Sequence, residues 1–263
     1  MIKENFWFGY NKIKKSYIWF VYIIFASYIL YLGITSSTIS TKLLFLTVGF
    51  LILSISLYYE YLKWIYQKMI FSLTMETNIP LAKKYQEKLI KQDFLHGFKQ
   101  SIILFDSLLL LDEGKYEECL IHMKKNENFF RSTLDYLLIF YHNKLICYYF
   151  LNEHEKGLKQ INKLLEIKSL NQKKYSPLFP WDEIEALRFF FEGRIKKSIQ
   201  TFLRIESKYL NAREKTYLYY MLAQGCKKIN DINKYGEYLN LARHQGNSLM
   251  IARKQGLQNE TFE

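Results

Sequence analysis

The sequence predicts an all-α protein in which a two-helix transmembrane hairpin precedes an α-solenoid of about four helix pairs. Two long apolar segments lie near the start of the chain, and residues 16–41 contain no Asp, Glu, Lys, Arg or His. Only three prolines and eleven glycines interrupt the 263 residues, which favours helices. From residue 98 onward, apolar helical patterns alternate with short turns at nearly constant intervals.

The first apolar segment is long enough to cross a bilayer, because a hydrocarbon core of about 30 Å needs roughly 20 residues of helix. The second, residues 43–59, is shorter but can extend past Glu60, which would lie near the interface. Residues 33–41 are small, hydroxylated and β-branched, so they favour a turn. We therefore expect transmembrane helices at about residues 16–34 and 42–62, within a membrane anchor of residues 1–75.

Lysines predict the orientation of this hairpin, since short loops rich in Lys and Arg stay cytoplasmic. Lysines precede the first segment and follow the second, whereas Lys42 alone lies between them. Both termini are therefore expected in the cytoplasm, in a multi-pass protein of the cell membrane. Aromatic residues gather at both edges, as is typical of the headgroup level: Trp7, Tyr10, Tyr17 and Trp19 at one, and Tyr58, Tyr59, Tyr61, Trp64 and Tyr66 at the other.

Two alternatives exist for the apolar segments. A cleaved signal peptide also follows lysines, but the first run exceeds a typical hydrophobic region of about 7–15 residues and no A-x-A-like site is present. A second apolar segment also follows at once. The other alternative is a pair of buried core helices in a soluble protein, which the near absence of charge opposes.

The net charge of +12 divides into +5 for residues 1–75 and +7 for the remainder. Such an excess suits an anionic membrane face, solubility or nucleic acid. No Arg-rich helix, zinc module or aromatic RNA-binding strand accompanies it, so nucleic acid is an unlikely partner. Cys119, Cys147 and Cys226 each lie in an apolar helical pattern and are expected to be buried free thiols.

The remaining chain divides into helices by its capping residues. Asn78 and Pro80 predict the start of a linker helix within residues 76–97. Helix pairs are expected at residues 98–128, 132–168, 181–210 and 212–245, with a final helix to about residue 255, in a domain of residues 98–256 followed by a tail at 257–263. Ser132, Asn152 and Asn211 each stand three residues before a carboxylate, as N-cap residues do.

Turn residues recur at the spacing of a helix-hairpin repeat. Gly114, Asn152, Gly193 and Asn230 are 38, 41 and 37 residues apart. The turn Gly114-Lys115-Tyr116-Glu117-Glu118-Cys119 resembles the Gly-x-Tyr-x-x-Ala turn of the tetratricopeptide repeat (TPR), with Cys in place of Ala. Small residues also lie where paired helices would approach closely: Ser107, Cys119, Gly157, Ala186, Ser198, Ala223 and Ala242.

The resemblance covers roughly residues 98–245, about half the chain. It departs from the family in three respects. The usual Pro at the end of each repeat is missing, Leu145 and Tyr235 occupy positions that are small in the family, and the spacings exceed 34 residues. The resemblance implies a domain of TPR-like helix pairs, which the lysine distribution places in the cytoplasm.

No catalytic arrangement is visible in the sequence. The histidines form no H-E-x-x-H motif, and Cys119 with His122 is a single i,i+3 pair that core packing explains. No G-x-S-x-G motif or glycine-rich phosphate loop is present. Acidic clusters at residues 112–113, 117–118 and 182–185 lie at helix ends, where the helix dipole accounts for carboxylates. We expect no enzymatic activity, no cofactor and no metal.

The TPR resemblance implies that the first helix of each pair lines a concave groove. The family's groove positions correspond to His142, Ile146, Tyr149, Glu183, Leu187, Phe190, Tyr220, Gln224 and Lys227. Aromatic rings with a few charges suit an extended peptide or a helix. The alternative is that these side chains pack between repeats.

We therefore expect a membrane-anchored, non-enzymatic TPR-like scaffold that binds a protein or peptide partner at the cytoplasmic membrane face. The alternative function is an accessory or regulatory subunit of a membrane complex, such as a transporter or envelope machinery, held through its transmembrane hairpin. In that case Tyr22, Tyr28 and Tyr31 become candidate contacts, because lipid alone does not require hydroxyl groups within a span.

Overall fold

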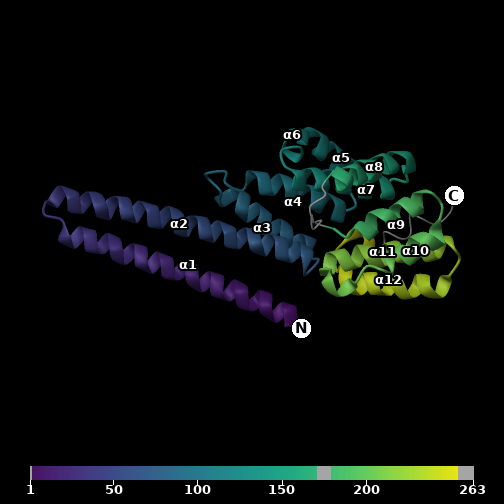
Figure 1. The fold of residues 1–263 in the computed structure, drawn as a ribbon, viewed down its shortest axis with the longest axis horizontal. Coiled ribbons are helices and arrows are strands. Elements are labelled where there is room, and N and C mark those ends of the chain that lie inside the picture. The colour runs from purple at the N-terminus through teal and green to yellow at the C-terminus, as the bar shows by residue number, and fades with distance from the viewer. Residues whose placement is uncertain (1, 171–178, 254–263) are drawn as a thin grey trace. The chain divides into compact units, whose positions relative to one another are not determined.

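The computed structural model describes residues 2–170 and 179–253, with side chains described for residues 19–169 and 179–253. Within these ranges the chain is helical and contains no strand (Figure 1). Contacts divide it into two units, Met1–Trp64 and Ile65–Glu263. The expected tail at residues 257–263 and the last part of the expected final helix lie outside the described residues.

Unit 1 contains α1 (Ile2–Thr35) and the first part of α2 (Ile39–Thr74). The helices run antiparallel, since Gly33 faces Leu46 and Gly49 faces Ile29. A Cβ atom on Gly49 would lie 2.4 Å from Cγ2 of Ile29, so this close approach requires glycine.

Among the described residues, α2 is the one helix long and apolar enough to cross a membrane. Only 6% of its most apolar stretch is buried, whereas a core helix of a soluble protein would be mostly buried. The described apolar part of α1, Trp19–Thr35, has 17 residues. The side chains of Trp7, Tyr10 and Tyr17, expected at a membrane edge, lie outside the described side chains.

The end of α2 belongs to unit 2, where Ile65, Met69 and Leu73 are fully buried. Helix α3 (Ile79–Gln92) begins as the sequence predicts, because the Asn78 side chain accepts a hydrogen bond from the Leu81 N–H at 3.0 Å. It also buries an apolar face against the unit. The segment expected as a linker is thus packed into the core of unit 2.

Four helix pairs follow. They are α4 (Lys99–Asp112) with α5 (Tyr116–Lys125), α7 (Leu134–Phe150) with α8 (His154–Leu170), α9 (Trp181–Phe191) with α10 (Ile195–Phe202), and α11 (Ala212–Lys228) with α12 (Ile232–Gly246). Shorter elements are α6 (Glu127–Phe130) and the 3₁₀ turns η1 (Ser207–Tyr209) and η2 (Met250–Ala252).

The turns inside the four pairs share one geometry. Gly114, Asn152, Gly193 and Asn230 all have a positive φ, between 56° and 76°. In each turn the N–H of this residue bonds to the carbonyl three residues back, and the next N–H bonds to the carbonyl five residues back. This pattern is the Schellman motif, which favours Gly or Asn at the left-handed position. The four turn positions predicted from the sequence are therefore confirmed.

Of the three caps predicted from a carboxylate three residues later, two are wrong and one is confirmed. Asn211 and Glu214 form the complete capping box of α11. Helix α7 is capped by Thr133 and not by Ser132, because the Ser132 hydroxyl donates to the Phe129 carbonyl and closes the preceding turn. Asn152 does not cap α8, because its left-handed backbone ends α7 instead.

Hydrogen bonds connect residues 77–79, near the start of unit 2, to residues 245–248, near its end. The Thr77 hydroxyl donates to the Gln245 carbonyl at 2.8 Å, and the Ser248 hydroxyl donates to the Thr77 carbonyl at 2.8 Å. The Ile79 N–H donates to the Ser248 hydroxyl oxygen at 2.7 Å. The first and last parts of the helical unit are therefore joined.

Candidate functional site

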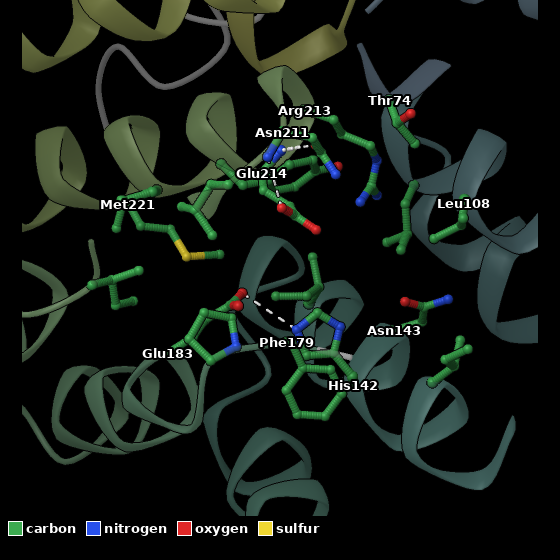
Figure 2. Close-up of a pocket in the computed structure, with 18 of the residues that line it drawn as sticks. Thr74, Leu108, His142, Asn143, Phe179, Glu183, Asn211, Arg213, Glu214 and Met221 are labelled. Atoms are coloured by element: carbon green, nitrogen blue, oxygen red, sulfur yellow. Dashed lines mark hydrogen bonds and ion pairs between the residues drawn. The ribbon is translucent and has the colours of Figure 1, made fainter. Parts of the chain in front are cut away.

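A cavity of about 230 Å³ lies inside unit 2 and is lined by the first helix of every pair, α4, α7, α9 and α11 (Figure 2). The end of α2, the end of α10, the residues before α9 and those before α11 complete its wall. Most of the lining is apolar: Leu104, Leu108, Leu111, Ile139, Ile146, Phe179, Phe202, Ile205, Leu210, Leu218 and Met221. Such a lining favours an apolar group as the occupant.

One polar pair bridges α7 and α9 at this cavity. His142 Nε2 lies 3.3 Å from Glu183 Oε1, and each side chain is 18% exposed. The His142 ring also stacks on Phe179, with ring centroids 4.3 Å apart. The stacking and the hydrogen bond together orient the imidazole toward the carboxylate (Figure 2).

A second carboxylate enters from the start of α11. Glu214 Oε2 accepts a hydrogen bond from the Asn211 N–H at 2.9 Å, and the Glu214 N–H donates to Asn211 Oδ1 at 2.9 Å. The capping box fixes the Glu214 side chain in a half-buried position on the cavity wall.

Arg213 also lines the cavity, and its positive charge is compensated by Asp112, which is not a lining residue. Its Nε donates to both oxygens of Asp112, at 2.9 and 2.7 Å. The Tyr217 hydroxyl also donates to Asp112, at 2.9 Å. Burial raises the pKa of the Asp112 carboxyl, and the Arg213 charge opposes that rise. The carboxylates that line the cavity are therefore Glu183, which lies beside His142, and Glu214.

The nine predicted groove residues divide into two groups. His142, Ile146 and Glu183 line the cavity together. The other six do not line it: Tyr149, Leu187, Phe190 and Tyr220 are buried, Gln224 is half-buried and Lys227 is exposed.

The buried aromatic residues of the second group pack between helices. The Tyr149 ring lies 5.0 Å from Phe190 on α9, and Tyr220 lies 5.7 Å from Phe150 on α7. These rings contact rings on neighbouring helix pairs, so they form interior contacts.

Several lining residues were not expected from the sequence. Arg213, Tyr217 and Met221 follow one face of α11 at intervals of four residues, and Leu104, Leu108 and Leu111 follow one face of α4. The four-residue interval is a signal that the sequence does contain. This interval identifies one face of a single helix, but it does not determine which helices pack against each other.

Within the part of the chain that the structure describes, no group of three His, Cys, Asp or Glu residues is arranged to hold a metal ion. Hydrogen bonding with Cys119 and burial raise the pKa of the Cys147 thiol, so it is not an activated nucleophile. The cavity is also smaller than the roughly 300–1,000 Å³ of small-molecule and cofactor sites.

Comparison with models of protein families, with curated proteins and with solved structures gave no match for this chain. The features that bear on function are therefore the geometry of the helical unit and the apolar surface of α2.

Proposed function

We propose that the chain is a membrane-anchored, non-enzymatic scaffold whose TPR-like helix pairs bind a protein or peptide partner at the cytoplasmic membrane face. The observation that carries this proposal is the cavity lined by the first helix of all four pairs. In helical repeat proteins, the curvature of the stacked repeats creates a concave binding surface.

The size and lining of the cavity suit one bulky apolar side chain of a partner segment. Burying such a side chain contributes about 1.5–3 kcal/mol, which is the scale of an anchor residue in a peptide interface. Glu183 and Glu214 add acceptors for backbone N–H groups or for a basic residue next to the anchor. The favoured partner is therefore a segment that combines a large apolar residue with a basic neighbour.

The anchoring part of the proposal is a two-helix hairpin with both termini in the cytoplasm. It is supported by the exposed apolar side chains of α2, such as Phe50, 70% exposed, and of α1, such as Ile23, 62% exposed. Confinement at the membrane would raise the effective concentration of the helical unit toward membrane partners. A reporter fused at Ser37 should lie outside the cytoplasm, and a cytoplasmic signal would contradict the hairpin.

An accessory subunit held through the hairpin is the second candidate function. The observation that favours it is the exposure of two tyrosines in the apolar part of α1, Tyr28 at 56% and Tyr31 at 61%. A hydroxyl group is costly in lipid, so it marks a contact surface for another membrane helix.

One experiment separates the two functions. The full chain is purified in mild detergent and its partner is quantified for the cavity variant L108W, the control L241W and the helix variant Y28L/Y31L. Leu108 lines the cavity, whereas Leu241 lies on α12 and is 39% exposed. Loss of the partner in L108W alone supports the scaffold, and loss in Y28L/Y31L alone supports the accessory subunit. Retention in all three would contradict both.

A further inference from the structure

The loop between α3 and α4 holds two apolar side chains in solvent. Phe94 is 78% exposed and Leu95 is 72% exposed. The Asp93 carboxylate, almost fully buried, accepts hydrogen bonds from the N–H groups of Gly97 at 3.0 Å and Phe98 at 2.8 Å. His96 completes the turn with φ of 55°. The loop is therefore closed by its own carboxylate, and its tip is apolar.

Basic residues surround this tip. Lys88 and Lys91 on α3 and Lys99 at the start of α4 are all exposed, and Ile90 between them is 54% exposed. The exposed acidic residue on this stretch of α3 is Glu87. Exposed apolar residues ringed by lysines are typical of surfaces that bind anionic lipid.

A hollow lies beside the loop. Its volume is about 330 Å³, and Ile90, Ile102 and Ile103 line it together with Asp93, His96 and Lys99. Apolar side chains next to an ammonium group suit the boundary between acyl chains and phosphates, where both kinds of group are present.

The end of the loop also contacts the part of α2 that belongs to unit 2. The Phe98 ring packs on Tyr66, with ring centroids 5.5 Å apart, and both residues belong to unit 2. Tyr66 follows Tyr59, where that segment ends, by seven positions. Seven residues reach at most about 25 Å even when fully extended. If the apolar segment lies in a membrane, the covalent chain therefore keeps Tyr66 within about 25 Å of the end of that segment.

We propose that Phe94 and Leu95 insert into the headgroup region of an anionic bilayer, with Lys88, Lys91 and Lys99 bound to lipid phosphates. This inference rests on the proposed membrane anchoring and adds a second lipid contact, made by the helical unit itself. The contact would limit the orientations of the unit at the membrane and so fix how its cavity is presented.

The test places an environment-sensitive fluorophore on the full chain in vesicles of phosphatidylcholine with phosphatidylglycerol. The label is attached to F94C or to the control I232C, whose native side chain is 65% exposed on α12. The native cysteines are buried and stay unlabelled. The inference predicts blue-shifted emission and quenching by nitroxide lipids at position 94, and quenching by aqueous iodide at position 232.

Flotation of the same samples separates the two proposals. If the chain floats with the vesicles but position 94 is quenched by iodide as strongly as position 232, the loop proposal is overturned and the anchoring stands. If the chain does not float, the anchoring fails and the loop proposal falls with it. A blue shift that requires an added protein partner would also overturn the lipid proposal.

The lysines are tested by charge reversal. The variant K88E/K91E/K99E should lose most of the blue shift at position 94 in anionic vesicles. The control K163E/K208E/K234E, with the same charge change at exposed lysines of α8, η1 and α12, should retain it. Equal loss in both would show a general effect of net charge and would contradict a specific lipid contact.

Discussion

Arg213 Nε donates to both carboxylate oxygens of Asp112 and joins α11 to α4 across 101 residues of sequence. The Asp112 side chain is fully buried and the Arg213 side chain is 15% exposed. This buried ion pair therefore connects α4 to α11 beside the cavity that Arg213 lines. Removal of one partner would leave the other as a buried charge without compensation.

We predict that R213M lowers the free energy of unfolding by about 3–5 kcal/mol, because breaking a buried ion pair leaves one charge unpaired. The double variant D112L/R213M should recover a large part of that loss, since neither charge remains. Thermal or urea unfolding of R213M, D112L and D112L/R213M gives the coupling free energy between Asp112 and Arg213. Additive losses would contradict a direct pair.

Gly157 on α8 is a second point of close packing. A Cβ atom there would lie 2.6 Å from Phe191 Cε2 on α9. G157A should therefore destabilise the unit by about 1–3 kcal/mol through overpacking. In the matched control G236A, nothing lies within 4 Å of the new Cβ, so helix propensity should stabilise α12 by about 0.5–1 kcal/mol. The same sign for both variants would contradict this account, and G157A/F191L should restore stability.

The turn geometry makes a separate prediction. Gly193 has φ of 73° and open space around its Cα, so G193A tests backbone strain alone. We expect a loss of about 1–2 kcal/mol, the cost of a left-handed conformation for an L-residue with a side chain. N230G, at φ of 60°, should be neutral or slightly stabilising. Equal thermal midpoints for wild type and G193A would contradict the left-handed turn.

Stability should fall between neutral and mildly acidic pH because of His154. Burial, with a smaller contribution from Lys228, lowers the pKa of this imidazole. The unfolded chain therefore binds a proton at higher pH than the folded chain does. The stability that the neutral His154 provides is present above about pH 6.5 and is lost as pH falls through the lowered folded pKa. Thermal midpoints from pH 8 to pH 5 should fall less in H154Q than in wild type.

Local features of the fold were predictable from sequence and long-range ones were not. Gly114, Asn152, Gly193 and Asn230 were identifiable because a left-handed turn requires Gly or Asn. The cap of α7 was misplaced by one residue because Ser132 and Thr133 both have hydroxyl groups.

The candidate site was predictable only in part. The TPR resemblance predicted nine groove positions, and three of them, His142, Ile146 and Glu183, line the cavity, whereas the other six do not. The pairing of Asp112 with Arg213 was not visible, because no local pattern connects residues 101 positions apart. The hydrogen bonds between residues 77–79 and 245–248 likewise depend on the closure of the whole unit.

The most direct test of the scaffold places a photo-crosslinking residue at position 108, inside the cavity, or at position 241, outside it, in the full chain within its own cell membranes. Mass spectrometry then maps the crosslinked peptides. The account predicts that position 108 captures one segment of a single protein, with a large apolar residue beside a basic one, and that position 241 does not capture it. Identical products at both positions, or only links within the chain at position 108, would contradict peptide binding in the cavity.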